Sequence, residues 1–246
     1  MSGLARELWR LPAVSLAPSA IEILTAELRQ RLRLVTGAHA GVRFASSMAA
    51  EDMVLVDAIA TSGVPIEIFT IDTGRLHEET VRMVEVTERH YGILIGRAAA
   101  PEQEVRAFVE NHGLNGFYES EDAKKACCHA RKVVPLNLAL AGAGAWITGQ
   151  RREQAVTRTE LGLAEHDEAR GIAKYNPLFD WSQDAVWSYL QHRNVPLHPL
   201  HRQGYPSIGC EPCTRAIRAD EDLRAGRWWW LRQESKECGL HLNAAQ

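Results

Sequence analysis

Four of the five cysteines in this chain stand in two pairs, Cys127-Cys128 and Cys210-Glu211-Pro212-Cys213. Thiolates bind zinc and iron–sulfur clusters, and either kind of site usually takes four of them. A fold that joins both pairs in one site must bring these two segments together. A single zinc ion favours spaced pairs, whereas a multi-iron cluster is wide enough to take adjacent cysteines on different irons. The alternative is a set of buried free thiols, because cysteine is among the most frequently buried residues.

Strand-like and helix-like segments alternate along the chain. Apolar residues with a period of two predict strands, and apolar residues at helical spacing predict helices. The resulting order predicts an α/β fold, a mostly parallel twisted sheet flanked by helices. We expect strands at 42–45, 65–72, 93–95 and 145–149. We expect helices from a capping box at Ser19-Ala20-Ile21-Glu22, and at 53–60, 77–90, 102–111, 124–140 and 182–192.

Two polar turns follow strands at the edge of the sheet where open α/β folds bind ligands. The first runs from Ser46 to Asp52 and joins a strand to a helix N-terminus, a general arrangement for binding anions. It lacks the glycines and the Gly-Lys-Ser/Thr ending of a Walker A loop, and a purely structural turn is an equal alternative. The second turn is Asp72-Thr73-Gly74-Arg75. A polar loop with arginines occupies 150–171, a length that is more often functional than idle.

Length and charge exclude several classes of protein. The 246 residues are enough for one large domain or one domain with a tail. A net charge of −3 argues against nucleic-acid binding by bulk charge, although it is compatible with a local basic pocket. The sequence shows no secretion signal and no run of roughly 20 apolar residues, so we expect a cytoplasmic protein without a membrane span. Free thiols fit such a reducing compartment.

The end of the chain carries two further features. Trp228, Trp229 and Trp230 cannot share one face of a helix, so we expect them to pack the tail onto the body or to form a partner surface. Cys238, with His241 close by in a polar tail, is a candidate nucleophile. The alternative is an incidental thiol.

Three motifs in this order resemble the assimilatory sulfonucleotide reductases, in particular the adenylyl-sulfate (APS) reductases of the iron–sulfur type. They are the paired cysteines, the ending Glu237-Cys238-Gly239-Leu240-His241, and Ile71-Asp72-Thr73-Gly74-Arg75. The resemblance covers nearly the whole chain from about residue 40. It implies a PP-loop adenine-nucleotide-binding α/β domain that also binds a cluster, residues 1–227, and a mobile C-terminal tail, 228–246, that carries the nucleophilic cysteine.

The resemblance also implies an activity, the thioredoxin-dependent reduction of APS to sulfite and AMP through an S-sulfocysteine, in sulfate assimilation towards cysteine. It implies a 4Fe-4S cluster on Cys127, Cys128, Cys210 and Cys213. The implied catalytic residues are Cys238 and His241. The implied substrate-binding residues are Ser46, Asp72, Thr73, Gly74, Arg75, Lys132, Gly149, Arg158, Arg224 and Arg227.

One position departs from the family pattern. The family's nucleotide loop usually carries a glycine after its second serine, where this chain has Met48 and Ala49. We expect Ala49 to tolerate a positive φ less well than glycine, so neither residue is counted among the expected contacts.

Other functions are compatible with parts of the sequence. A reductase of 3′-phosphorylated APS (PAPS) is the nearest, but such enzymes typically lack the paired cysteines. A PP-loop enzyme that uses ATP would carry a Ser-Gly-Gly-x-Asp-Ser loop. A non-enzymatic zinc or nucleic-acid module leaves Cys238 unexplained. Separately, His198 and His201 lie in a loop with prolines and are candidates for a two-histidine zinc site. A homo-oligomer is compatible with the sequence, which fixes no oligomeric state.

Overall fold

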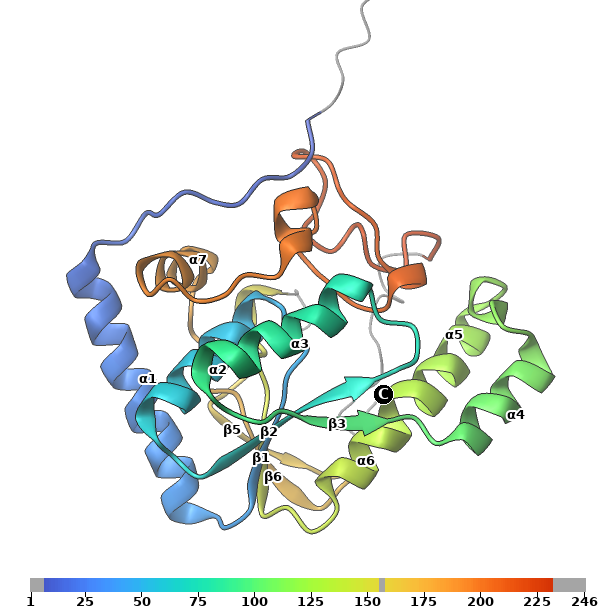
Figure 1. The fold of residues 1–246 in the computed structure, drawn as a ribbon, viewed down its shortest axis with the longest axis horizontal. Coiled ribbons are helices and arrows are strands. Elements are labelled where there is room, and N and C mark those ends of the chain that lie inside the picture. Colours follow the sequence, from blue (N-terminus) through green and yellow to red (C-terminus); the bar gives the residue numbers. More distant parts are fainter. Residues whose placement is uncertain (1–6, 155–157, 232–246) are drawn as a thin grey trace, which may run out of the picture.

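The protein is built on one twisted sheet, shown in Figure 1. A computed structural model describes residues 7–154 and 158–231. The sheet has six strands in the order β3-β2-β1-β4-β6-β5, and every neighbouring pair is parallel except β5 with β6. The prediction of a mostly parallel sheet is therefore confirmed. The strands are β1 (Val42–Ala45), β2 (Ile66–Asp72), β3 (Gly96–Ala99), β4 (Ala145–Ile147), β5 (Ala164–Asp167) and β6 (Ile172–Tyr175).

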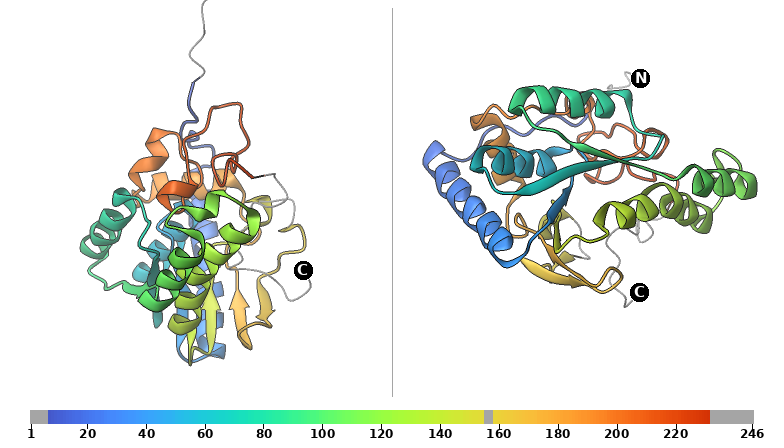
Figure 2. Two further views of the ribbon diagram at one scale, coloured as in Figure 1. Left: turned by 90° about the vertical axis from the view of Figure 1, so that its right-hand side faces the viewer. Right: turned by 60° about the horizontal axis from the view of Figure 1, so that its bottom comes forward.

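Helices cover both faces of this sheet (Figures 1 and 2). Four of them, α1, α2, α3 and α7, share one apolar core with β1, β2 and β4. Helix α6 covers the opposite face, while α4 and α5 extend beyond the sheet. The bounds are α1 (Pro18–Ala38), α2 (Ala50–Ser62), α3 (Glu78–Tyr91), α4 (Glu102–His112), α5 (Glu121–Cys128), α6 (Val134–Leu140) and α7 (Gln183–His192).

Strand β2 shows how the sequence divides the two cores. Ile66 and Ile68 alternate onto the face that packs against α2 and α3, whereas Phe69 and Ile71 join the cluster around α6. Successive side chains of a strand point to opposite faces, so a strand buried on both faces is apolar on both. This double burial places β2 next to the centre of the sheet.

Serine caps explain where two helices begin, whereas the cap predicted for a third helix is wrong. Ser120 and Ser182 cap α5 and α7, because each hydroxyl accepts the amide N–H three residues on. The capping box expected at Ser19 does not form. Helix α1 begins at Pro18, whose ring fixes a helical φ and lacks the amide proton, and the preceding Ala17 makes no side-chain cap.

The third strand lies later than predicted. We expected it at 93–95, but β3 begins at Gly96, which pairs with Phe69. The amide of Ile95 instead donates to the Glu88 carboxylate at 3.0 Å, so this residue belongs to the turn after α3. A Cβ on Gly96 would lie 3.2 Å from Cβ of Phe69, and glycine therefore allows the strands to approach closely here.

The loop expected over 150–171 contains a strand that sequence reasoning missed. Residues 164–167 form β5, which pairs antiparallel with β6 through a turn at Gly171, where φ is +64°. Both strands are only four residues long, and their polar residues mask the alternation.

The predicted helix over 124–140 is confirmed in outline, but its middle is not α-helical. After α5 ends at Cys128, residues His129–Val133 form one π-helical segment (η2) before α6 begins. An extra residue per turn changes the direction in which the following side chains project. Short 3₁₀ segments occur elsewhere: η1 (Gly116–Tyr118), η3 (Arg152–Gln154), η5 (Pro199–Gln203) and η6 (Glu211–Cys213).

Within the described residues, no helix is both long and apolar enough to cross a membrane.

A buried carboxylate fastens α2 to α7. Asp57 accepts hydrogen bonds from the hydroxyls of Tyr189 at 2.5 Å and Tyr91 at 3.1 Å, and from Nε of Arg193 at 2.6 Å. Its side chain is only 5% exposed. Removing one member of such a buried group leaves the others without compensation, which costs far more than losing an exposed pair.

We therefore expect Asp57→Ala to lower the free energy of unfolding by about 3–5 kcal/mol. Asp180→Ala is the matched control, because its ion pair with Arg31 is partly exposed and should contribute at most about 1 kcal/mol. Urea unfolding of both variants checks this. Equal losses would contradict the assignment of Asp57 as the main polar contact between α2 and α7.

Candidate functional site

A pocket lies where β1, β2 and β4 end. Strand β1 lies between β2 and β4. The chain adds β2 and β3 on one side of β1 and then places β4 on the other side, so the strand order reverses at β1. A crevice forms at such a switch point, at the carboxyl ends of the strands. The pocket has a volume of about 330 Å³. The residues expected at the site that line it are Ser46, Thr73, Lys132, Gly149, Arg158, Cys210, Arg224 and Arg227.

The turn after β1 forms one wall. Ser46 is buried, and its hydroxyl accepts the amide of Met48 at 3.2 Å. Met48 itself takes the left-handed conformation, with φ of +62°, and its side chain is fully buried. We expected the strain at Ala49, which instead has φ of −80° and precedes α2. The helix N-terminus faces the pocket and favours an anion there.

Asp52 holds this turn in shape. Its carboxylate accepts the Ser47 amide at 2.6 Å and the Ser47 hydroxyl at 2.5 Å. Burial raises the pKa of Asp52 to about 6, because the hydrogen bonds from Ser47 only partly offset the loss of solvent. The backbone at Gly149 packs against this carboxylate, because a Cβ on Gly149 would lie 2.2 Å from Oδ1 of Asp52.

The turn after β2 is divided between the pocket and its surroundings. Thr73 is buried and lines the pocket, but Asp72, Gly74 and Arg75 are not among the lining residues. Oδ1 of Asp72 accepts the Gly74 amide at 2.9 Å, which closes the turn. The Arg75 guanidinium points to η1 and donates to Oδ1 of Asn115 at 2.9 Å.

The four paired cysteines lie together. All four are buried free thiols, and they share an apolar cluster whose other fully or nearly buried members are Phe108, Phe117, Ala130 and Trp228. The Cys210 loop is held by backbone pairing to the turn after β2: the Glu211 amide donates to the Arg75 carbonyl at 2.8 Å, and Leu76 and Cys210 form an isolated β-bridge. Within the described residues, no three His, Cys, Asp or Glu side chains form a group that could hold a metal ion.

The charge around the thiols is uneven. Burial opposes ionisation of Cys210, but Lys132, the Thr73 hydroxyl and Arg227 outweigh it and lower the pKa of that thiol. Burial and the neighbouring Cys210 raise the pKa of Cys213 to about 12. Burial likewise raises the pKa of Cys127, so the surroundings favour a thiolate at Cys210 but not at Cys127 or Cys213.

Segment η2 places two basic residues on different targets. Arg131 is buried and donates to the Thr73 carbonyl at 2.8 Å, whereas Lys132 lines the pocket. The sequence predicted Lys132 as a site residue but not Arg131, because the sequence pattern does not show that a π-helical turn changes the directions of these side chains.

Arg227 reaches the pocket across a glycine. Its guanidinium donates to the Ile208 carbonyl at 3.0 Å and to the Ser207 hydroxyl at 3.3 Å. A Cβ on Gly209 would lie 2.3 Å from one guanidinium nitrogen of Arg227, so any larger residue at this position would displace the guanidinium. The same guanidinium lies 4.6 Å from the ring centroid of Trp228.

The tryptophan run behaves as expected for packing onto the body. Trp228 is 1% exposed and its amide donates to the Cys213 carbonyl at 3.0 Å. Trp230 packs on Tyr118 with ring centroids 4.5 Å apart, while Trp229 remains 40% exposed. The proposed nucleophile Cys238 and His241 lie outside the described residues, as does most of the expected tail.

His198 and His201 are buried in the fold beside this site. His198 shares a 2.9 Å hydrogen bond with the Thr80 hydroxyl, and His201 one of 2.7 Å with the Tyr205 carbonyl. Burial, together with the nearby His201, lowers the pKa of His198 to about 3. Both histidines therefore serve as packed, neutral hydrogen-bonding groups.

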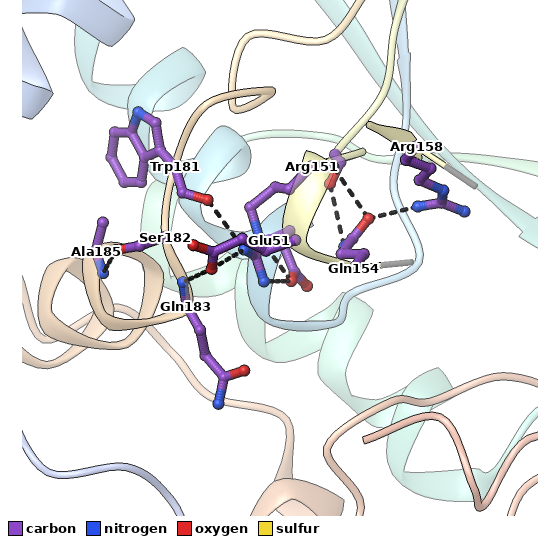
Figure 3. Close-up of polar contacts among 10 residues, drawn as sticks. Glu51, Arg151, Gln154, Arg158, Trp181, Ser182, Gln183 and Ala185 are labelled. Carbon is purple, nitrogen blue, oxygen red and sulfur yellow. Dashed lines mark hydrogen bonds and ion pairs between the residues drawn. The ribbon is translucent and has the colours of Figure 1, made fainter. Parts of the chain in front are cut away.

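A polar network that sequence reasoning missed forms the wall between α2 and η3 (Figure 3). Arg151 is buried and makes two hydrogen bonds to Glu51, of 2.8 and 3.1 Å, and one of 3.0 Å to the Trp181 carbonyl. Burial opposes ionisation of Glu51, but the Arg151 charge and hydrogen bond hold the pKa of the Glu51 carboxyl below its usual range. Gln154 and Arg158 continue the network.

Gln150 was also missed. It lines the pocket and is 6% exposed, yet its Oε1 is buried without a hydrogen-bond partner among the described residues. A buried polar atom of this kind calls for a donor, which a bound ligand or an ordered water supplies.

The raised pKa of Asp52 predicts how stability changes with pH. Its pKa rises from the ordinary 3.8 to about 6, so between these values the folded protein binds the proton more tightly than the unfolded chain. Stability contributed by this group therefore increases as pH falls through about 6. Relative to Asp52→Asn, the wild type should gain about 1 kcal/mol of unfolding free energy between pH 7.5 and 5. Parallel denaturant titrations check this, and a difference that is flat with pH would refute it.

Comparison with known proteins agrees with this geometry. The phosphoadenosine phosphosulfate reductase domain matches residues 41–216. A Burkholderia cepacia protein called adenosine 5′-phosphosulfate reductase is 55% identical over 231 residues, which are 94% of this chain and 90% of that protein. The crystal structure of PAPS reductase from Candida auris has a TM-score of 0.65 at 25% identity and covers 83% of this chain and 100% of that chain.

The expected PP-loop fold is also confirmed by a more distant structure. Yeast FAD synthetase, at 15% identity, has a TM-score of 0.54 and covers 84% of this chain and 71% of that chain. The likeness at this identity concerns the fold alone. With a family domain that spans most of the chain and a relative that is more than half identical, the chain belongs to the phosphoadenosine phosphosulfate reductase family.

Proposed function

We propose that this protein reduces APS to sulfite and AMP in sulfate assimilation towards cysteine, in the cytoplasm, with thioredoxin as electron donor. The observation that carries the proposal is the 55% identity to a relative named adenosine 5′-phosphosulfate reductase. The pocket supports it, because five basic residues line it: Lys132, Arg151, Arg158, Arg224 and Arg227, of which Arg151 is paired with Glu51. A sulfate–AMP anhydride carries negative charge on both halves and needs such cations.

We propose that Cys127, Cys128, Cys210 and Cys213 hold a 4Fe-4S cluster. Support comes from their shared burial and from the cations that favour thiolate at Cys210. When bound, such a cluster ties α5 to the Cys210 loop and shapes the field around Lys132. Because thioredoxin supplies the electrons, the cluster need not change oxidation state.

The substrate contacts follow from the pocket. Ser46, Thr73 and Gly149 line it at the strand ends, and we assign the adenosine to these three; Asp72, Gly74 and Arg75 lie outside the lining. We assign the anionic groups to Lys132, Arg158, Arg224 and Arg227. Removing a preorganised group that stabilises developing negative charge typically raises the activation free energy by about 2.7–4 kcal/mol.

In the proposed reaction the Cys238 thiolate attacks the sulfur of APS. The bond between this sulfur and the bridging oxygen breaks, and AMP leaves with its electron pair, which yields S-sulfocysteine at Cys238. His241 positions or polarises the sulfonyl group. A thioredoxin thiolate then attacks Sγ of Cys238 and releases sulfite, and the second thioredoxin thiol resolves the mixed disulfide.

Cys238→Ser tests the nucleophile. The variant should be folded and brown, like the wild type, but inactive, because a serine hydroxyl is far less ionised than a thiol at neutral pH. Incubation with APS labelled in its sulfur should leave no label on the protein after denaturation. A labelled variant would show that another residue attacks.

Removal of a cluster ligand should act differently. We expect Cys127→Ser to lose iron, acid-labile sulfide, activity and folding stability together, because the cluster joins two chain segments. Metal and sulfide analysis of anaerobically purified protein measures this. A colourless wild-type protein with full activity would overturn the cluster assignment.

PAPS is the one alternative substrate with a structural argument, because the Candida auris neighbour is a PAPS reductase. Measured kcat/KM for the two nucleotides decides between them. The paired cysteines and the Burkholderia relative favour APS.

A further inference from the structure

We propose that Gln154 is a positioning residue that holds the Arg158 guanidinium in the pocket wall before substrate binds. The inference rests on the proposed function only in assigning Arg158 to the substrate anion. Gln154 lies in η3 and is not one of the cationic residues that we assign to the substrate. The sequence patterns predict no role for it.

Gln154 makes polar contacts through both the oxygen and the nitrogen of its amide group. Oε1 accepts the Arg158 guanidinium at 2.5 Å and the Arg151 amide at 3.0 Å. Nε2 lies 3.5 Å from the Gly149 carbonyl, at the long end of hydrogen-bond range. One side chain therefore connects the end of β4, the first turn of the loop and Arg158 (Figure 3).

The loop that carries Gln154 is itself anchored. The Arg151 side chain is 5% exposed and is held by Glu51, by Glu153 at 3.4 Å and by the Trp181 carbonyl. Glu153 also accepts the Gln183 amide at 2.8 Å, which fastens η3 to the start of α7. Because Glu51 belongs to the first turn of α2, the chain of contacts runs from the Ser46 turn through Arg151 and Gln154 to Arg158.

A neutral acceptor suits this task. Arginine loses side-chain entropy when it is ordered, and a cation that is already ordered does not incur this cost on binding. A carboxylate at this position would hold Arg158 equally well but would cancel the charge that the substrate needs. The Gln154 amide accepts this guanidinium hydrogen bond without adding a negative charge of its own.

A double-mutant cycle tests the proposal. Gln154→Met keeps the length of the side chain but removes the acceptor, and should lower kcat/KM about tenfold. In an Arg158→Ala background the same change should have less than a twofold effect, because no guanidinium remains to be positioned. Gln30→Met, at an exposed site on α1, is the control and should match the wild type. Losses that multiply in the double variant would overturn the proposal.

A second measurement is independent of turnover. In ligand-free protein labelled with ¹⁵N-arginine, the Arg158 side-chain Nε–H signal is identified by its loss in Arg158→Lys. It should be sharp and shifted in the wild type and in Gln154→Glu, which keeps the acceptor, and averaged in Gln154→Met. An Arg158 signal that is the same in all three overturns the positioning role. If APS is not the substrate, rates vanish in every variant, including the wild type, while this signal still reports on Gln154.

Discussion

Thr73 is the point at which three distant segments of this protein meet. Its carbonyl accepts Arg131 from η2, its hydroxyl lies 3.4 Å from Sγ of Cys210, and the same hydroxyl accepts the Arg75 amide at 3.2 Å. The residue is 2% exposed, so each of these polar contacts must be satisfied inside the protein. The end of β2 thereby fixes both cysteine pairs and one wall of the pocket at once.

Five basic and four acidic side chains line the pocket of this chain, whose net charge is −3. Arg131 and Arg227 donate to main-chain carbonyls, which are neutral acceptors that order a guanidinium without cancelling its charge. Gln154 does the same for Arg158. Arg151 differs, because its partner Glu51 is a buried carboxylate and the pair contributes rigidity. Composition alone therefore says little about the field inside the pocket.

Much of the fold was predictable because strong apolar patterns lie where strands and helices are buried. Strand β2 and helix α3 were placed within a residue or two of their observed bounds. The predictions failed where the deciding contact is not local. Residues 93–95 are apolar, but the register with Phe69 begins at Gly96, and the β5–β6 hairpin depends on pairing that four-residue polar strands do not announce. At the site, Ser46, Thr73, Gly149 and the cations could be chosen from motifs, whereas Glu51, Arg151 and Gln154 could not, because their roles exist only as contacts with one another.

The sequence by itself determined the fold class, the two cysteine pairs and the motifs that point to a sulfonucleotide reductase. These are properties of residue type and spacing, which remain legible in an unfolded chain. Only the tertiary structure decided that Met48 rather than Ala49 takes the left-handed conformation. It also decided that Arg75 turns towards η1 and away from the pocket lining, and that a π turn separates the targets of Arg131 and Lys132. Each of these outcomes is set by which neighbour occupies the adjacent space, and that neighbour comes from a distant part of the chain. The paired cysteines show both sides, since their spacing predicted that two distant segments meet, and the tertiary structure buries all four in one apolar cluster.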